Sequence, residues 1–214
     1  KTLPPPRGGN WIYIPHAETG VPLYKRQVEG SVPWVAVLDS DDDSFADAIY
    51  AGTTTGRMYK VDISTPQRLV DIDVHDLGDP GSGVALTEWA TQRITAAEWE
   101  PFAIFQAPTG QPIYMQVQVL FVARLGRFAL VFGTGDREDL WSFDSNEGRL
   151  YVIVDDGFTP LTPDLPFTEA DYHRVDPSAT ALANSSNLLL DPSGGTGSQR
   201  GWFMALDPDE RTGG

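Results

Sequence analysis

The hydrophobic positions of this chain fall in short runs, and polar turn residues separate the runs. Val, Ile, Tyr, Trp and Phe fill each run, and Gly, Pro, Asp or Asn bounds it, which is the pattern of β-strands. The predicted strands are 11–14, 34–38, 48–51, 57–61, 69–73, 102–105, 112–122, 127–132, 149–154 and 201–206. Because helix signals are few, the pattern predicts an all-β fold.

Three segments depart from this pattern. Residues 86–100 carry Ala, Glu and Gln, but their aromatic and aliphatic positions form no helical stripe, so the segment is either a helix or two strands joined by a loop. Residues 176–200 are rich in Ser, Gly and Asn, which predicts a long loop with one short strand. Three successive prolines, Pro4–Pro6, favour extended backbone. We therefore expect a linker over 1–10 and one β-rich segment over 11–214.

A weak internal repeat suggests how the strands are organised. Residues 56–62 (GRMYKVD) resemble residues 148–154 (GRLYVIV), and a Gly-Thr pair precedes each copy, at 52–53 and at 133–134. The copies begin 92 positions apart. A four-stranded propeller blade takes about 40–50 residues, so this spacing matches two blades. The alternative is a chance similarity between two hairpins.

One loop has the residue pattern of a cation site. Asp39, Asp41, Asp43 and Asp47 occupy its positions 1, 3, 5 and 9, and Phe45 at position 7 offers a backbone carbonyl. Ca²⁺ takes six to eight oxygen ligands, and this spacing is the one that EF-hand loops use. A chain that curls around an ion presents every second side chain inward. The loop therefore predicts a Ca²⁺ site with these five residues as ligands.

The loop departs from the helical EF-hand at two positions. Position 6 is Ser44, where the sharp turn usually has Gly, and position 12 is Tyr50, where a bidentate Glu is required. Apolar runs at 35–38 and 48–50 flank the loop, so two strands and not two helices deliver it. Asp47 is then expected to be the closing ligand.

The alternative for this loop is a solvated acidic turn. Two carboxylates 4 Å apart repel by about 1 kcal/mol in bulk water and by about 4 kcal/mol at an effective dielectric constant of 20. Five aspartates between two apolar strands therefore favour a bound cation. Asp42, at position 4, is expected to point outward and is not a predicted ligand.

The overall charge limits the partners. The chain has 30 acidic and 15 basic residues, a net charge of −15, which repels phosphate backbones and anionic lipid, so no nucleic-acid partner is expected. No apolar run is long enough to predict a membrane span. The absence of cysteine excludes disulfides and thiolate sites. A chain that starts at Lys1, without a signal peptide, is expected to be a processed piece or part of a longer protein.

Catalytic patterns are weak in this sequence. His16, His75 and His173 are isolated from any nucleophile or zinc motif, and the turn at 133–135 lacks the Lys of a phosphate loop. Two further acidic groups, at 71–79 and 136–144, lack ligand spacing and are expected to be solvated loops. Paired carboxylates for glycoside hydrolysis remain open, because their separation is spatial. We expect a protein that is not an enzyme.

The calcium loop and its neighbours resemble a known family. The loop with its flanking strands is followed by a Tyr-x-Gly turn and a hairpin that ends in an aromatic residue, a basic residue and Asp, as in PilC/PilY-type type IV pilus tip adhesins and biogenesis factors. A Phe-Gly-Thr-Gly segment, the strand after it, and a Gly-Trp strand with a following Glu-Arg are also similar. The stretches that carry the resemblance are 35–53, 56–62, 128–135, 149–155, 201–206 and 210–211. Ser44 in place of Gly, and a chain far shorter than the family's whole C-terminal propeller, are the differences.

The resemblance implies a β-propeller, or part of one, built from four-stranded antiparallel blades. It implies a secreted protein at the pilus tip that supports pilus assembly, adhesion to host or abiotic surfaces, and twitching motility. Calcium would tune pilus extension against retraction. Minor pilins and the remaining segment of the same protein would be its partners.

Two other readings compete with this one. An extracellular enzyme on a propeller scaffold, such as a glycosidase or a quinoprotein-like dehydrogenase, would show two facing carboxylates or a bound quinone. An integrin-like calcium propeller would repeat the acidic loop in several blades, whereas it occurs once in this sequence.

Overall fold

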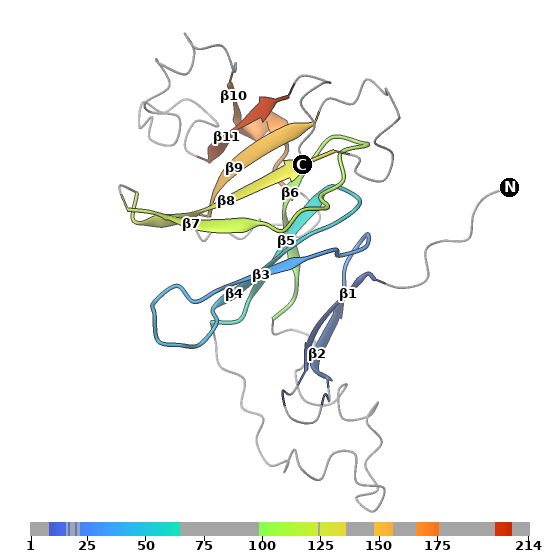
Figure 1. Ribbon diagram of the computed structural model, residues 1–214, viewed down its shortest axis with the longest axis vertical. Coiled ribbons are helices and arrows are strands. Elements are labelled where there is room, and N and C mark those ends of the chain that lie inside the picture. The colour runs from blue at the N-terminus through green and yellow to red at the C-terminus, as the bar shows by residue number, and fades with distance from the viewer. Residues whose placement is uncertain are drawn as a thin grey trace, which may run out of the picture.

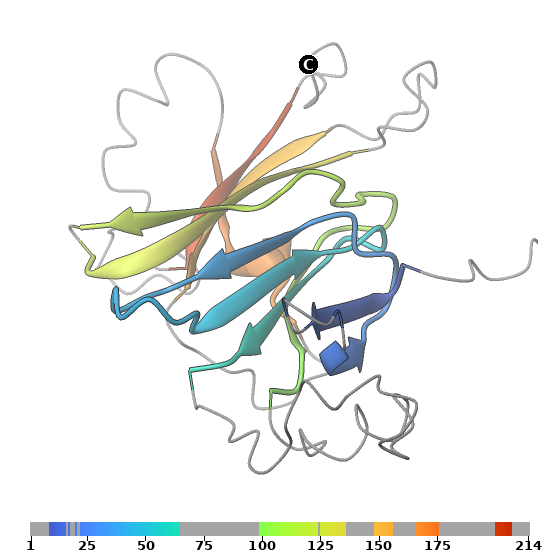
Figure 2. The same ribbon diagram turned by 60° about the horizontal axis from the view of Figure 1, so that its bottom comes forward.

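The computed structural model describes residues 9–15, 17, 20, 22–64, 99–123, 125–135, 148–155, 166–175 and 200–206. Within these ranges the chain is all-β, in three sheets, and its helical structure is a single 3₁₀ turn, η2 (Glu169–Asp171). None of the helical structure in these ranges is long and apolar enough to cross a membrane. Figures 1 and 2 show the sheets as successive layers, with the β1–β2 hairpin beside the β3–β6 sheet.

The first sheet, called the first blade below, is four-stranded and antiparallel in the order β3-β4-β5-β6, and the five-stranded sheet is called the second blade. Its strands are β3 (Val35–Leu38), β4 (Ala48–Gly52), β5 (Arg57–Asp62) and β6 (Phe102–Gln106). Each strand pairs with its neighbour in the chain, so the sheet is a simple meander. All five residues of β4 are buried, because both faces of this strand are covered.

The second blade has the order β10-β11-β9-β8-β7. Its strands are β7 (Gln118–Val122), β8 (Arg127–Thr134), β9 (Arg149–Asp155), β10 (His173–Val175) and β11 (Gly201–Ala205). Strands β7, β8, β9 and β11 pair antiparallel as a four-stranded blade, and β10 adds to β11 in parallel as a fifth strand.

The two blades pack face to face through an aromatic core. The first blade contributes Tyr50, Met58 and Phe105, and the second contributes Leu130 and Tyr151, all fully buried. The rings of Phe105 and Tyr151 lie 4.8 Å apart, a separation typical of favourable aromatic pairs. Burial of this apolar surface is what holds the blades together.

The opposite face of the first blade packs against a two-stranded hairpin. Its strands are β1 (Trp11–Pro15) and β2 (Pro22–Gln27), and its Ile12 and Tyr24 are buried against Ile49, Val61 and other residues of β4, β5 and β6. The alternation of side chains along β4 explains the two cores: Ile49 faces the hairpin and Tyr50 faces the second blade.

The internal repeat predicted from the sequence corresponds to equivalent positions in the two blades. Gly52 pairs with Met58 in the first blade, and Gly133 pairs with Leu150 in the second. The spacing was misread, however. The two copies lie in adjacent blades and not two blades apart, because residues 65–98 connect β5 to β6 within the first blade.

Most predicted strands in the described ranges are confirmed, with three exceptions. The segment predicted over 112–122 is a strand only from Gln118, because Gln111 and Ile113 lie in the connection between the blades. Strands β2 and β10 were missed, since charged residues such as Lys25, Arg26 and Arg174 interrupt their apolar positions. Residues 1–8 of the linker predicted over 1–10, the strand predicted at 69–73, the acidic group at 136–144, and most of 86–100 and 176–200 lie outside the described residues.

Candidate metal centre

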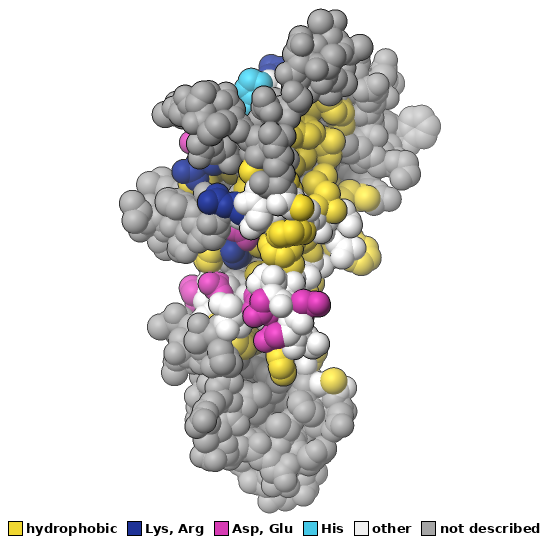
Figure 3. Space-filling model, turned by 90° about the vertical axis from the view of Figure 1, so that its left-hand side faces the viewer, with side chains coloured by type: hydrophobic (Ala, Val, Ile, Leu, Met, Phe, Trp, Pro, Cys, Tyr) yellow, Lys and Arg dark blue, Asp and Glu magenta, His cyan; other side chains and the backbone are white. Residues whose placement is uncertain are grey.

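The acidic loop joins β3 to β4, as predicted from its apolar flanks. Leu38 and Ala48 form the last residue pair of strands β3 and β4 before the loop. At this point the Asp47 N–H donates to the Leu38 carbonyl at 2.7 Å. Because both strands are held in the first blade, the loop projects from a rigid base at the left of Figure 1. Figure 3 shows acidic side chains gathered on this side, next to a group of hydrophobic ones.

Three of the predicted ligands lie together. One carboxylate oxygen each from Asp39, Asp41 and Asp43 falls within 4.8 Å of the others. Asp39 is half-buried at the base of the loop, and the other two are exposed. Three convergent carboxylates are a hard-oxygen donor set of the type that Ca²⁺ binds.

Backbone N–H groups of the loop hold these carboxylates in place. Asp39 accepts from the N–H of Asp42 at 2.8 Å and from that of Ser44 at 2.9 Å. Asp43 accepts from the Phe45 N–H at 2.8 Å, and Asp41 accepts from the Asp43 N–H at 3.2 Å. Such contacts form local Asx turns, which curl the loop around the three side chains.

The curl requires left-handed backbone at two positions that are not glycine. Asp42 has φ +62° and Ser44 has φ +75°. Asp tolerates this region well, whereas Ser lacks the same preference. Ser44, at the position where EF-hand loops carry Gly, therefore adopts the left-handed backbone that glycine favours.

Asp47 stands apart from the three-carboxylate group. Its side chain accepts hydrogen bonds from the Ser40 hydroxyl and, at 2.6 Å, from the Ser40 N–H. These bonds lower the pKa of the Asp47 carboxyl, the hydroxyl contributing most. Through these hydrogen bonds to Ser40, Asp47 joins the two ends of the loop.

The pKa of the Asp41 carboxyl is shifted in the opposite direction. Loss of solvation raises the pKa of its carboxyl, and the charge of Asp43 raises it further, with smaller contributions from Asp47 and Asp39. Ionisation of Asp41 is therefore opposed in the folded loop, and a bound cation would favour it. The Phe45 side chain is 74% exposed at the tip, so its predicted contribution rests on the backbone alone.

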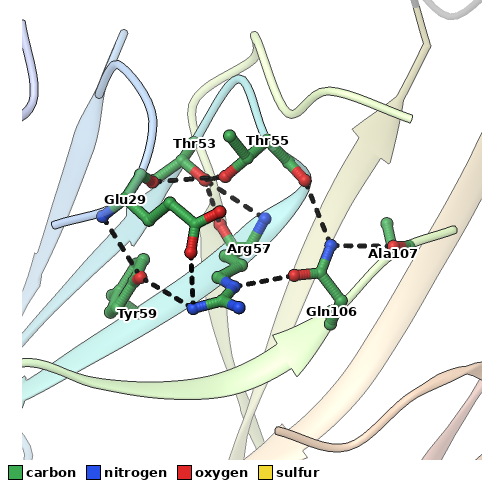
Figure 4. Close-up of polar contacts among 7 residues, drawn as sticks. All are labelled: Glu29, Thr53, Thr55, Arg57, Tyr59, Gln106 and Ala107. Atoms are coloured by element: carbon green, nitrogen blue, oxygen red, sulfur yellow. Dashed lines mark hydrogen bonds and ion pairs between the residues drawn. The ribbon is translucent and has the colours of Figure 1, made fainter. Parts of the chain in front are cut away.

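A second polar cluster lies at the other end of the first blade and was not predicted (Figure 4). Arg57 pairs with Glu29 at 2.9 Å and donates to the Gln106 side chain at 2.8 Å, while Tyr59 accepts from the Glu29 N–H. The Gln106 amide also donates to the carbonyls of Thr55 and Ala107. No sequence spacing connects Glu29 to Arg57, because different elements supply them.

The fold and the loop define an all-β, blade-type protein with an acidic strand-to-strand loop. No family model matches the sequence, and no curated protein does. A solved structure that it resembles is the crystal structure of the Pseudomonas aeruginosa PilY1 C-terminal domain. The match has a TM-score of 0.56 and 18% sequence identity, and it covers 91% of this chain. The chain spans 44% of that solved chain, and the likeness is one of fold.

Proposed function

We propose that this chain is a calcium-binding β-propeller segment of a type IV pilus tip-associated adhesin, and not an enzyme. It would be secreted, lie at the pilus tip on the cell surface, and support pilus assembly, adhesion to host or abiotic surfaces, and twitching motility. The fold-level likeness to the PilY1 C-terminal domain supports the pilus assignment. Minor pilins and a remaining segment of the same protein are the proposed partners.

The convergence of Asp39, Asp41 and Asp43 carries the calcium part of the proposal. Ca²⁺ needs six to eight oxygens at 2.3–2.6 Å. Each carboxylate has about four lone-pair sites, so it can keep its N–H bond and still coordinate an ion. The Phe45 carbonyl, Asp47 and water would complete the shell. Bound Ca²⁺ would relieve the repulsion at Asp41 and act as a clamp between β3 and β4.

A calorimetric titration with CaCl₂ tests the site. Asp43→Asn removes one ligand charge from the group, and Asp42→Asn removes the same charge from a side chain predicted to point outward. Asn tolerates the left-handed backbone at position 42, so the control is matched in charge and conformation. We expect Asp43→Asn to weaken binding by roughly tenfold or more, about 1.4 kcal/mol, and Asp42→Asn to leave it nearly unchanged. Equal binding heats for the two variants, or no binding heat for the unmodified chain, would contradict the proposed Ca²⁺ site.

The cellular role needs a separate experiment. In a strain that carries the gene, we expect the protein in the sheared pilus fraction and co-purification with minor pilins. Deletion should reduce surface pili and twitching, and the Asp43→Asn allele should restore protein level without full motility. A cytoplasmic protein whose loss leaves pili unchanged would contradict the pilus assignment while leaving the calcium site standing.

One observation favours the alternative, an extracellular propeller-type enzyme. A cleft of about 620 Å³ between the ends of the blades is lined by two carboxylates, Glu29 and Glu169. Both are ion-paired, Glu29 with Arg57 and Glu169 with Arg149 at 2.6 Å. Glycoside hydrolysis needs one protonated carboxyl as the acid, and an arginine partner opposes protonation. The binding role is therefore the better supported of the two.

A further inference from the structure

The β1–β2 hairpin covers the outer face of the first blade incompletely. Tyr24 and Arg26 of β2 contact the segment before β6: the Tyr24 hydroxyl donates to the Trp99 carbonyl at 2.6 Å, and Arg26 pairs with Glu100 at 3.1 Å. Strand β2 therefore lies over the β6 side of the blade. Strand β1 lies nearer to β3, and β3 itself keeps two large apolar side chains open to solvent, Val35 at 40% and Val37 at 59%.

The strand positions equivalent to Val35 and Val37 are more buried in the second blade. Val37 pairs with Ile49 in the first blade, and Val119 pairs with Leu130 at the equivalent place in the second. Val119 is partly buried against the inter-blade core, and Val117, two residues earlier, is 3% exposed. The same strand positions are covered when a complete sheet lies over them. Among the described residues, no strand lies over Val35 and Val37 as the first sheet lies over Val117 and Val119.

An apolar groove lies along this open face of β3. Its volume is about 560 Å³, within the usual range for binding sites. All five residues of β1 line one side and β3 lines the other, with Ile49 and Ile63 as further apolar surface. The groove begins at Val32, whose N–H donates to the Gly9 carbonyl before β1, and it also reaches Ala46 of the acidic loop.

The edge of β1 beside this groove has backbone groups available for pairing. The Asn10 carbonyl accepts from the Val28 N–H, so alternate residues Ile12 and Ile14 direct their N–H and C=O groups to β2. Trp11 and Tyr13 then direct theirs to the opposite edge. Within the described ranges, β2 is the strand that pairs with β1. A two-stranded hairpin is marginal in water, and an open edge of this kind accepts a further strand.

We propose that this groove binds an extended polypeptide segment from another protein, which adds to the free edge of β1 as a third strand. The segment carries apolar residues at alternate positions, which cover Val35 and Val37, and a Lys or Arg at the end next to the acidic loop. Strand addition supplies main-chain hydrogen bonds for affinity, and the alternating side chains supply specificity.

Charge decides between this occupant and a second copy of the chain. Five aspartates lie between residues 39 and 47, and one bound Ca²⁺ would leave a formal charge of −3 there. A basic strand end is attracted with or without the ion. Two copies, each with a net charge of −15, repel one another on approach. The proposal is therefore independent of calcium binding and of the pilus assignment.

Fluorescence anisotropy with a labelled synthetic peptide tests the groove. The probe alternates valine and threonine and has lysine at both ends, so either strand direction is allowed; a matched probe has glutamate at both ends. We expect the lysine probe to bind the chain in the presence and in the absence of Ca²⁺, and to bind more weakly as salt is raised. Equal binding of the two probes would contradict the proposed occupant.

A pair of variants locates the binding surface. Val37→Asp places a charge in the groove, and Leu120→Asp places the same charge on β7, where the side chain is exposed to a similar degree (53%). Because both side chains face solvent, both variants should fold, which circular dichroism checks. We expect Val37→Asp to weaken lysine-probe binding by roughly tenfold and Leu120→Asp to leave it unchanged. Equal binding by Val37→Asp and the unmodified chain would overturn the proposal.

N-methylated probes test the pairing itself. A strand that pairs along one edge uses the N–H groups of every second residue. A probe methylated at every residue cannot pair in either strand direction, and we expect it to lose binding, whereas a probe methylated at every second residue can still pair in the direction that turns its free N–H groups toward β1. Equal affinity of the fully methylated and the unmethylated probe would exclude strand addition. Sedimentation equilibrium provides the last check, since a dimer that Val37→Asp dissolves would assign the groove to a second copy and overturn the proposal.

Discussion

Lys60→Met is expected to destabilise the chain strongly, because Lys60 joins the two blades. Its Nζ lies 2.7 Å from the Asp155 carboxylate on β9, and the Tyr50 hydroxyl donates to the same carboxylate. The Lys60 and Asp155 side chains are only 12% and 13% exposed. Burial raises the pKa of Tyr50, as do the charge of Asp155 and its hydrogen bond with the hydroxyl. The cluster therefore holds one anion between one cation and one neutral donor.

The magnitude follows from the geometry. At 2.7 Å and an effective dielectric constant of 20, the pair attracts by about 6 kcal/mol, and desolvation of both ions cancels most of that gain. Without Lys60, the Asp155 carboxylate stays buried away from water and loses the attraction of its cationic partner. Loss of one partner of a buried pair costs about 3–5 kcal/mol; since Tyr50 still donates, we expect about 2–3 kcal/mol.

Equilibrium unfolding in urea, followed by tryptophan fluorescence, measures this loss. Arg127→Met removes an exposed cation from β8 and should change the free energy of unfolding by less than about 0.5 kcal/mol. The double variant Lys60→Met with Asp155→Asn should recover at least about 1 kcal/mol relative to Lys60→Met, because no unpaired charge stays buried. A Lys60→Met effect as small as that of Arg127→Met, or a double variant with no recovery, would refute the reasoning.

Three further predictions concern the acidic loop. Ser44→Gly should stabilise the chain by roughly 0.5 kcal/mol in urea unfolding, since relief of left-handed strain exceeds the added entropy of the unfolded chain; destabilisation would contradict this. Asp41→Asn should raise the melting temperature in chelator, because ionisation of Asp41 is opposed in the folded loop, and should remove the increase that Ca²⁺ gives the unmodified chain. Ser40→Ala should lower stability at pH 7, and less so in acid. The pKa of Asp47 is lowered on folding, so its contribution is present above the ordinary value of about 3.9 and is lost as the pH falls through the folded value. A difference between Ser40→Ala and the unmodified chain that stays constant from about pH 6 to pH 2 would argue against this role.

Local sequence patterns predicted most strands of the described ranges and the place of the acidic loop, because both depend on neighbouring residues. Alternation and turn residues predicted β3 and β4, which the structure contains. The spacing of the aspartates predicted that Asp39, Asp41 and Asp43 would converge, and their carboxylates lie together. The position of Asp47 was harder to predict. Its distance along the chain fits a closing ligand, but the hydroxyl of Ser40 competes for the same carboxylate, and no ligand pattern includes that contact.

Contacts between distant segments were beyond such patterns. The pairing of Lys60 with Asp155 spans 95 positions and depends on how two sheets stack. The spacing of the repeat was misread for a related reason, because a period assumes equal blades. Residues 65–98 separate β5 from its partner β6 in the sequence, so the two copies are 92 positions apart although their sheets are adjacent.

The repeat also shows how one sequence motif serves two different neighbours. In both blades an arginine and a tyrosine two positions later lie on the same face of the third strand, and both contact one glutamate from outside the strand. Arg57 and Tyr59 contact Glu29, which precedes the first blade, whereas Arg149 and Tyr151 contact Glu169 of η2, which follows β9. The strand thus encodes the cation and the hydroxyl, and the acid comes from whichever connection lies at that end of the sheet. This division explains why the motif could be found by self-comparison while its acidic partners could not.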